Sequence, residues 1–389
     1  MRYGSDLSFV FSSPTRLVFG AGQVSEAGME AERIGITRAL LVSDRVLAER
    51  TDLVGRVSKA LGSRLAATFV DVPPDSGVDA VMAGYAAARE AGADGVVSVG
   101  GGSVIDTAKG IAILVREGGH LRDFEGFQLL TRRAASHVVV PTTAGTGSEV
   151  TYVAVIKDHQ AKRKLLFGDY NILPDVAILD PEMTLALPGP LTAATGMDAL
   201  SHALEAMHSL QREPVADALA LHAIRIVREA LPACVSTPGD VAARGRQLLA
   251  STMAGAAFSN AQVGLVHAMS HTAGAHFGVH HGLANSICMP HVVRFNAEEC
   301  GEVYREVATA FGVPADGDDA AVADRLAGAL EAFARSLGLP TRLADVKVPR
   351  DALPALAEAT LFDGSLVYNA KPVSDAAGIL PVWEAAWGA

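Results

Sequence analysis

The sequence lacks any apolar run long enough to cross a bilayer. Its longest runs, such as "GIAILV" and "HVVVP", are far below the ~20 residues that a membrane helix requires. The first stretch of the chain alternates like a strand, and polar residues interrupt it too often for a secretory signal. We therefore expect a cytoplasmic protein without a membrane partner.

Cysteines and clustered basic residues are also scarce. The three cysteines form no CxxC pair, which fits a reducing compartment and argues against a disulfide framework. The formal net charge is −11 and no run of Lys and Arg occurs, so nucleic acid is not an expected partner. Half of the 389 residues are apolar, which is enough for the cores of two domains.

Two kinds of hydrophobic periodicity divide the chain. Short β-branched strings at 39–44, 66–72, 95–100, 137–143 and 176–180 alternate with helical stretches. This alternation predicts an α/β domain with a mainly parallel sheet over residues 1–187. Ala- and Leu-rich segments with a 3.6-residue period follow, and they predict an all-helical domain over residues 188–389, with the boundary at Pro188-Gly189-Pro190.

Two glycine loops are candidate phosphate sites. A buried strand runs directly into Gly100–Ser103, where a helix starts, so bare amides and a helix N-terminus would face an anion such as a pyrophosphate. The second loop, Pro141–Glu149, follows another hydrophobic strand with glycines and small hydroxyl residues. Two such loops on neighbouring strands predict a bound dinucleotide.

A third glycine motif is weaker. Gly20–Ser25, "GAGQVS", almost matches GxGxxG, but its last position is serine, and we interpret it as a tight turn rather than a phosphate site. Asp44 ends the string "LLVSD", where a carboxylate could bind an adenosine ribose and repel a 2′-phosphate. That position favours NAD over NADP.

Histidines gather between Leu265 and Gly282. His267 and His271 are four residues apart on a helical segment, and Asp198 and His202 have the same spacing on an earlier one. His281 starts a third segment. Together Asp198, His202, His267 and His281 offer one carboxylate and three imidazoles, a set suited to Fe(II), Zn(II) or another divalent ion.

Several long motifs give the sequence a known likeness. They read "GGGSVIDTAKG", "PTTAGTGSEVT", "AILDPEMTLALP", "TGMDALSHALEA" and "HAMSHTAGAHFGVHHGLANSICMPHVVRFN". In these motifs and their order, over nearly the whole chain, the sequence resembles the iron-dependent (group III) alcohol dehydrogenase family. The resemblance implies a Rossmann-like N-terminal domain and a helical C-terminal domain that binds the metal.

The resemblance also implies roles for individual residues. The metal ligands would be Asp198, His202, His267 and His281, and His271 would lie near the nicotinamide. The implied cofactor-binding residues are Asp44, Gly101, Gly102, Ser103, Thr142, Thr143, Thr146 and Lys164. Phe258 matches a pocket position, where it would supply an apolar wall.

Three positions depart from the family pattern. Tyr152, which we place in the substrate pocket with Phe258, stands where relatives vary, and His280 stands where many carry proline. The usual "NPR" near the C-terminus is "NAKP" here, from Asn369. These departures leave the expected chemistry intact and the substrate undefined. His276, His280 and His291 receive no role.

We expect an NAD-preferring, metal-dependent alcohol dehydrogenase or aldehyde reductase that acts on a small primary alcohol or aldehyde, with His271 relaying the proton. Alternatives within oxidoreductases are a hydroxyacid–oxoacid transhydrogenase, a 4-hydroxybutyrate dehydrogenase and a maleylacetate reductase. An acid substrate would need a clamping cation, and the ligand-bearing segments 198–202 and 267–281 contain no Arg or Lys. A dehydroquinate-synthase-like lyase and a non-enzymatic metal or nucleotide sensor are more distant alternatives. The resemblance and the strand-like N-terminus suggest a homodimer or a higher homo-oligomer.

Overall fold

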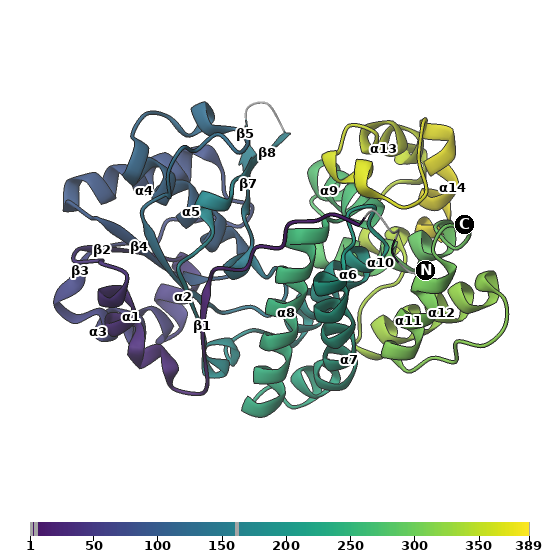
Figure 1. Cartoon of the computed structure of the whole chain (residues 1–389), viewed down its shortest axis with the longest axis horizontal. Helices are drawn as coiled ribbons and strands as arrows, with labels where there is room; N and C mark the ends of the chain where they lie inside the picture. Colours follow the sequence, from purple (N-terminus) through teal and green to yellow (C-terminus); the bar gives the residue numbers. More distant parts are fainter. Residues whose placement is uncertain (1–2, 4–6, 160–162, 389) are drawn as a thin grey trace. The chain divides into compact units, whose positions relative to one another are not determined.

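The computed structural model describes Tyr3, residues 7–159 and residues 163–388, which divide into two compact units (Figure 1). One unit contains Ser12–Leu187, and the other contains Pro188 onward together with the described residues before Ser12. The N-terminal residues therefore depart from the expected division at 1–187 and 188–389. Their grouping has a physical cause: the Tyr3 hydroxyl donates to Asp217, and the Arg212 guanidinium lies 5.4 Å from the Tyr3 ring centre.

A parallel six-stranded sheet forms the centre of the first unit, in the order β1-β9-β6-β4-β2-β3. The strands are β1 (Arg16–Phe19), β2 (Ala39–Val42), β3 (Leu65–Phe69), β4 (Gly95–Gly100), β6 (Ser136–Pro141) and β9 (Val176–Leu179). Five of them lie on the strings that predicted strands, and the α/β parallel fold is confirmed. The residues before β1 that were expected to alternate like a strand have no regular structure from Leu7 to Thr15.

Helices cover both faces of this sheet (Figure 1). They are α1 (Ala27–Arg33), α2 (Arg45–Arg50), α3 (Leu53–Leu61), α4 (Val78–Ala91) and α5 (Gly102–Glu117). In β2, Leu40 packs in one core with α4 and α5, whereas the next residue, Leu41, packs in another with α1 and α3. Because successive strand side chains point to opposite faces, a sheet buried on both faces needs the continuous apolar runs seen here.

A second, three-stranded sheet was missed by the sequence analysis. It contains β5 (Gly126–Phe127), β7 (Val153–Asp158) and β8 (Arg163–Gly168), with β7 and β8 antiparallel. The charged residues of β7 and β8 hid the hairpin, because only every second residue of β7 is buried.

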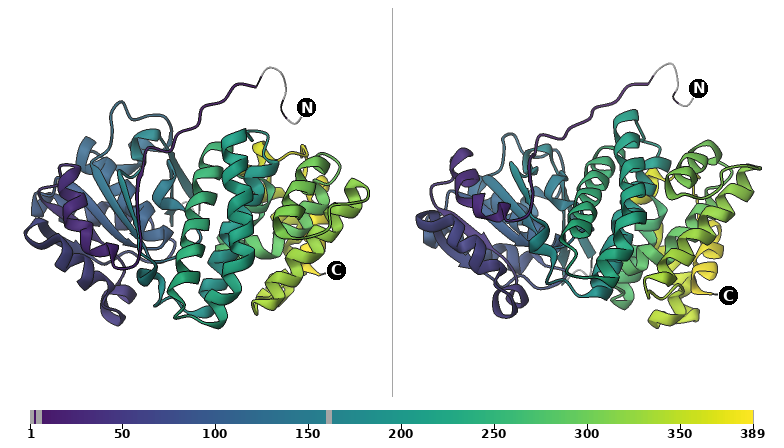
Figure 2. Two further views of the ribbon diagram at one scale, coloured as in Figure 1. Left: turned by 60° about the horizontal axis from the view of Figure 1, so that its bottom comes forward. Right: turned by 90° about the horizontal axis from the view of Figure 1, so that it is seen from below.

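The second unit is built from helices (Figure 2). They are α6 (Gly189–His208), α7 (Pro214–Ser236), α8 (Val241–Ala261), α9 (Leu265–Phe277), α10 (His281–Phe295), α11 (Gly301–Phe311), α12 (Asp319–Ser336), α13 (Leu353–Thr360) and α14 (Ala376–Trp387). One core of Ala, Leu, Val and Met side chains joins them, and α6 is buried along most of its length. Among the described residues, no helix combines the length and hydropathy that a transmembrane span requires.

Local signals explain where several of these helices begin. Glu213, Asp240, Asp318 and Asp375 are N-caps whose carboxylates accept hydrogen bonds from the first-turn amides of α7, α8, α12 and α14. Helix α9 is different, because its N-cap is Gly264 and offers no side chain. Its first amides are bound by side chains from other parts of the unit.

Candidate metal and cofactor sites

Helix α6 supplies the first two predicted metal ligands. Asp198 and His202 are one turn apart on the same face, and both are buried. The His202 Nε2 atom lies 4.0 Å from Asp198 Oδ1. A carboxylate and an imidazole thus face the same point from inside the helical unit.

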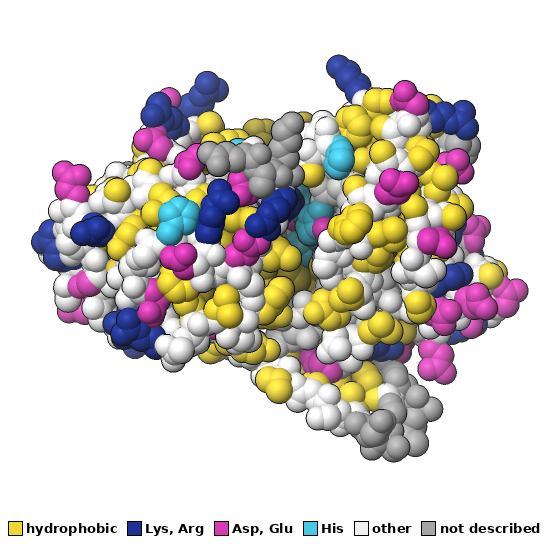
Figure 3. All heavy atoms as spheres, turned by 90° about the horizontal axis from the view of Figure 1, so that it is seen from above, with side chains coloured by type: hydrophobic (Ala, Val, Ile, Leu, Met, Phe, Trp, Pro, Cys, Tyr) yellow, Lys and Arg dark blue, Asp and Glu magenta, His cyan; other side chains and the backbone are white. Residues whose placement is uncertain are grey.

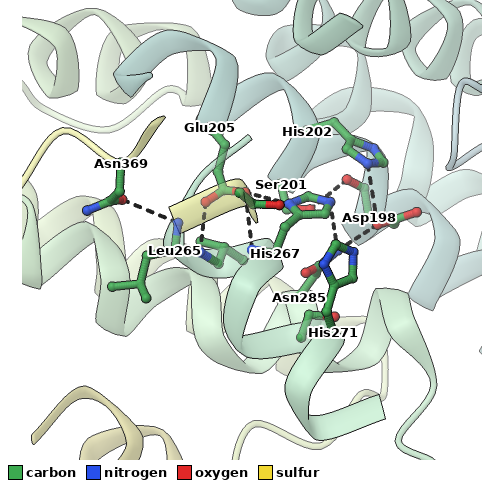
Figure 4. Close-up of polar contacts among 12 residues, drawn as sticks. Asp198, Ser201, His202, Glu205, Leu265, His267, His271, Asn285 and Asn369 are labelled. Carbon is green, nitrogen blue, oxygen red and sulfur yellow. Dashed lines mark hydrogen bonds and ion pairs between the residues drawn. The ribbon is translucent and has the colours of Figure 1, made fainter. Parts of the chain in front are cut away.

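The other two predicted ligands are His267, on α9, and His281, at the start of α10. Figure 4 shows the His267 ring beside Asp198 and His202. One donor atom from each of Asp198, His202, His267 and His281 lies within 4.8 Å of the other three, and His281 Nε2 is 3.6 Å from Asp198 Oδ1. Metal–ligand bonds of about 2.1 Å in a tetrahedron separate the donors by roughly 3.4 Å. The four groups therefore fit a first-row divalent ion with only small side-chain movements.

Close packing of α10 on α6 brings His281 to Asp198. A Cβ atom at Gly282 would lie only 2.3 Å from the carbonyl oxygen of Ala194 in α6. Because glycine has no Cβ atom, the α10 backbone can lie close enough to α6 for side chains of the two helices to form hydrogen bonds with each other. The start of α10 is thereby fixed against the helix that carries two of the four donors.

Asn285, which the sequence analysis missed, lies at the point where the donors converge. Its Nδ2 donates to Asp198 Oδ1 at 2.7 Å and lies 3.2 Å from His267 Nε2 and 3.3 Å from His281 Nε2. An electropositive N–H group thus occupies the place where three acceptor atoms point. The same three lone pairs would suit a cation, which supports a metal at this position.

Glu205, also missed, buttresses His267. Its carboxylate contacts His267 Nδ1 and accepts hydrogen bonds from the amides of Val266, at 2.7 Å, and His267, at 3.3 Å. Burial raises the pKa of Glu205, but its contacts with His208 and His267 outweigh burial and hold the pKa below the ordinary range. The spacing of Asp198, His202 and Glu205 at i, i+4 and i+7 was a signal that could have identified this residue.

His271 lies beside the four-ligand group. Its ring stacks on that of His281 with centroids 5.3 Å apart, and its Nδ1 is 2.9 Å from Asp363 Oδ2. Burial raises the pKa of Asp363, but the charge and hydrogen bond of His271 lower it well below its usual range. No sequence signal identified Asp363, because it lies on a distant loop of the same unit.

The two predicted pocket residues and the three unassigned histidines lie in different surroundings. Phe258 of α8 stacks on His202 with ring centroids 4.2 Å apart, so it forms an apolar wall against one donor. Tyr152 belongs to the α/β unit, where it is buried and packs on Tyr170 with ring centroids 4.9 Å apart. His276 and His280 are exposed, and burial lowers the pKa of His291 to about 4.

Most of the predicted cofactor residues of the α/β unit follow the carboxyl ends of strands in its six-stranded sheet, whereas Lys164 lies in β8 of the three-stranded sheet. Strands β2, β4 and β6 are parallel neighbours, and their carboxyl ends lead into Asp44, Gly101 and Thr142. The carboxyl edge of a parallel sheet is where such folds bind nucleotides. Asp44 also caps α2, since its Oδ1 accepts a hydrogen bond from Leu47 N at 2.9 Å.

The two glycine loops touch at this edge. Helix α5 begins at Gly102, and a Cβ atom there would lie 2.7 Å from Thr146 Cγ2, while one at Gly101 would lie 3.0 Å from Thr143 Cγ2. Bare backbone at the start of α5 is therefore a packing requirement and also leaves amides accessible to a phosphate. The geometry fits a pyrophosphate held by Gly101, Gly102 and Ser103.

Lys109, missed by the sequence analysis, fastens the second loop to α5. Its buried ammonium group lies within 3.0 Å of Ser148 Oγ and of three oxygens of Thr151 and Val153. Burial lowers the pKa of Lys109 to about 8, although the negative charges of Asp106 and Glu149 raise it in part. Lys164 on β8 lies close enough to Asp106 to favour its ionised form.

The weak motif at Gly20–Ser25 forms a tight turn. Gly22 adopts a left-handed conformation with φ of 77°, and a short 3₁₀ helix follows. The amide of Val24 donates to Asp180 Oδ2 at 3.0 Å. This amide is occupied by the protein's own carboxylate, which agrees with the structural interpretation of the motif.

Comparisons with known proteins identify the family of the chain. Residues 14–181 match the family described as "Iron-containing alcohol dehydrogenase", and residues 192–387 match "Fe-containing alcohol dehydrogenase family, C-terminal". The chain is 38% identical to the NAD-dependent methanol dehydrogenase of Bacillus methanolicus over 91% of this chain and 93% of that protein.

Solved structures give the same result over the full chain. A crystal structure of 1,3-propanediol oxidoreductase matches with a TM-score of 0.94 and 34% identity, covering 98% of this chain and 100% of that one. The sulfoacetaldehyde reductase of Bifidobacterium kashiwanohense, solved with NAD+, matches with a TM-score of 0.89 and 27% identity over 98% and 99% of the two chains. This chain belongs to the iron-containing alcohol dehydrogenase family.

Proposed function

We propose that the protein is a metal-dependent, NAD-linked alcohol dehydrogenase or aldehyde reductase that acts on a small primary alcohol or aldehyde. The observation that carries the proposal is the convergence of four donor groups within 4.8 Å inside the helical unit of a family member. The relatives support the reaction class, since they include a methanol dehydrogenase, a 1,3-propanediol dehydrogenase and a lactaldehyde reductase.

Asp198, His202, His267 and His281 would hold the metal, which we take to be Fe(II), with Zn(II) or another divalent ion also compatible with this donor set. When bound, the ion supplies Lewis-acid polarisation of an alcohol or carbonyl oxygen. Glu205 fixes His267 from outside, because its carboxylate contacts His267 Nδ1 and the first amides of α9.

The nicotinamide cofactor would lie along the carboxyl edge of the sheet, where it supplies or accepts the hydride. We assign Gly101, Gly102 and Ser103 to its pyrophosphate, and Thr142, Thr143, Thr146 and Lys164 to its surroundings. The Asp44 carboxylate favours NAD, because it would repel the 2′-phosphate of NADP.

His271 is our candidate for the group that moves the proton between substrate and solvent. Its Nδ1 contacts Asp363, and its ring stacks on that of His281, so the imidazole is held beside a proposed metal ligand. Phe258 and Tyr152 are the proposed pocket residues. A neutral substrate remains our choice over the acid-specific alternatives, because the ligand-bearing segments 198–202 and 267–281 contain no Arg or Lys.

The proposal includes a cytoplasmic location and a homo-oligomer. The three cysteines are free and buried, as in proteins of reducing compartments. Strand β1 lies at the end of the six-stranded sheet with Leu17 and Phe19 about half exposed, and such an edge suits pairing with a second copy. On the face shown in Figure 3, basic side chains stand among acidic ones.

The test is an assay of NAD and NADP reduction with a panel of short alcohols, using chelator-stripped protein reloaded with Fe(II), with Zn(II) or with no metal. We expect turnover that depends on the metal and is much faster with NAD. His267→Ala and His281→Ala should lose metal and activity together. His271→Ala should keep the metal and lose roughly 100-fold or more in rate.

Turnover by the metal-free protein, or no turnover in either direction with any metal, would contradict the proposal. If His271→Ala lost the metal, the proton-relay role would be wrong.

A further inference from the structure

The first turn of α9 has no cap of its own. Gly264 precedes it, and the amides that follow are bound by side chains from elsewhere in the unit (Figure 4). Asn369 Oδ1 accepts from Leu265 N at 3.4 Å, and the Glu205 carboxylate accepts from Val266 N and His267 N. Since the first amides of a helix carry a partial positive charge, a carboxylate is the stronger partner there.

The same Glu205 carboxylate contacts the Nδ1 atom of His267. An imidazole whose Nδ1–H is donated to a carboxylate carries its lone pair on Nε2. Nε2 is the atom of His267 that lies 3.2 Å from Asn285 Nδ2, at the point where the donors converge. One carboxylate therefore fixes the backbone, the tautomer and the ring direction of a candidate ligand.

Burial makes this contact stronger. Glu205 is 0% exposed, and a fully buried carboxylate is costly unless hydrogen bonds satisfy it. Behind it lie His208, whose Nε2 is 3.8 Å from Glu205 Oε1, and Tyr304, whose hydroxyl is 3.0 Å from His208 Nδ1. All three side chains are buried in the helical unit, away from solvent screening.

We propose that Glu205 is a positioning residue of the metal site: by capping α9 and accepting the Nδ1 proton of His267, it sets how strongly the protein binds its ion. The inference rests on the proposed function, because it takes His267 as a metal ligand. It goes beyond that function because it states that Glu205, which does not bind the ion itself, controls the affinity of the protein for the ion.

Glu205→Gln removes the charge while keeping the shape of the side chain, and Glu213→Gln is its matched control. Glu213 is also buried, at 1% exposed, and caps α7 by accepting from Val215 N at 2.8 Å and Ala216 N at 2.6 Å. Both substitutions weaken a buried helix cap in the same unit. The difference between them is that Glu205 contacts His267, a candidate metal ligand, whereas Glu213 only caps α7.

The measurement is the dissociation constant of Zn(II), by competition with a chromophoric chelator, on stripped wild type and both variants. We expect Glu205→Gln to raise the constant about 10- to 100-fold. Glu213→Gln should change it less than about threefold, because it lies outside the network. Equal affinity of Glu205→Gln and wild type, or an equal loss in both variants, would overturn the inference.

A second measurement needs no variant and covers the case in which Glu205→Gln fails to fold. In the zinc-loaded wild type, ¹⁵N resonances of the His267 ring should show the proton on Nδ1 and the metal on Nε2. The opposite arrangement would overturn the role of Glu205. Failure of wild type to bind zinc would instead contradict the proposed function, so the two failures are distinguishable.

Discussion

At the residue scale, His137 shows what complete burial does to an imidazole. It lies in β6 at 3% exposure, and its Nε2 is 2.8 Å from Ser98 Oγ. Its other nitrogen has no hydrogen-bond partner among the described residues. Burial, with a smaller effect of the Lys109 charge, lowers the pKa of His137 from 6.5 to about 3. The folded α/β unit therefore holds this ring neutral at pH values where the unfolded chain protonates it.

This difference predicts a loss of stability in acid. As the pH falls below 6.5 the unfolded state binds a proton that the folded state refuses, so unfolding becomes more favourable down to the folded pKa of about 3. Between pH 6.5 and pH 5 the effect of this one ring grows by roughly 1.7 kcal/mol. Wild type should lose that much more stability than His137→Asn, as measured by urea unfolding followed by circular dichroism.

The tryptophans provide an internal control for that experiment. Trp383 and Trp387, the chain's two tryptophans, both lie in α14 of the helical unit. Their fluorescence transition should have the same pH dependence in both proteins. An equal loss of stability by wild type and variant in the circular dichroism transition would show that His137 is not the responsible group.

Single residues were predictable from the sequence where helical spacing relates them. Asp198 and His202 share one turn, so their proximity followed from the helix period alone. Asp363 and Asn369 were not predictable from spacing, because they meet α9 only through the folding of a distant loop. Lys109 could have been noticed, since a lysine in an apolar helix three residues after Asp106 is unusual.

At the scale of elements, the contact between α6 and α10 decides the geometry of the donors. Alanine at Gly282 would bring its Cβ atom within 2.3 Å of the Ala194 backbone oxygen and 3.1 Å of Asp198 Cβ. A backbone oxygen cannot swing away as a long side chain does, so α10 would have to shift. His281 would move with it, because it is the neighbouring residue.

Gly282→Ala should therefore lower both the thermal stability of the helical unit and its metal affinity, with a cost of about 1–3 kcal/mol from overpacking. The matched control is Gly328→Ala in α12, where a Cβ atom meets nothing within 4 Å. That variant should gain about 0.5–1 kcal/mol from helix propensity. Calorimetry and zinc competition on the two variants would test this, and a Gly282→Ala protein as stable as Gly328→Ala would contradict it.

Element types were predictable because the two periods are distinct. Runs of Val and Ile gave strands buried on both faces, and Ala- and Leu-rich segments gave helices. The β7–β8 hairpin was not predicted, because charged residues such as Lys157 and Lys164 are more typical of loops. In the structure these two lysines lie opposite each other on the paired strands. The start of α9 could not be predicted from a local cap, since its cap is supplied by α6.

At the scale of the whole molecule, the proposed metal and the proposed nucleotide cofactor are each assigned to residues of one compact unit. The donor cluster belongs to the helical unit, and the glycine loops belong to the α/β unit. Hydrogen exchange should show this directly. Removing the metal should speed amide exchange in α6, α9 and α10, whereas saturating NAD should slow it around Gly101–Ser103 and Thr142–Thr146.

The size of the metal effect follows from mass action. An ion present at 100 times its dissociation constant stabilises the folded protein by about 2.7 kcal/mol. Strands β2 and β9 belong to the α/β unit and carry none of the four metal donors, so their exchange should not respond to the chelator. A metal effect confined to the α/β unit would contradict the assignment.

The order of the helices gives the donor cluster one more property. Helices α7 and α8 contain none of the four donors, yet they lie in the chain between α6 and α9. An ion shared by α6, α9 and α10 would act as a reversible crosslink that closes this stretch of chain into a loop. Because the ion binds the folded unit and not the unfolded chain, any opening of α7 or α8 that separates α6 from α9 would also lose the free energy of metal binding. Two helices that never touch the ion would thus owe part of their order to it.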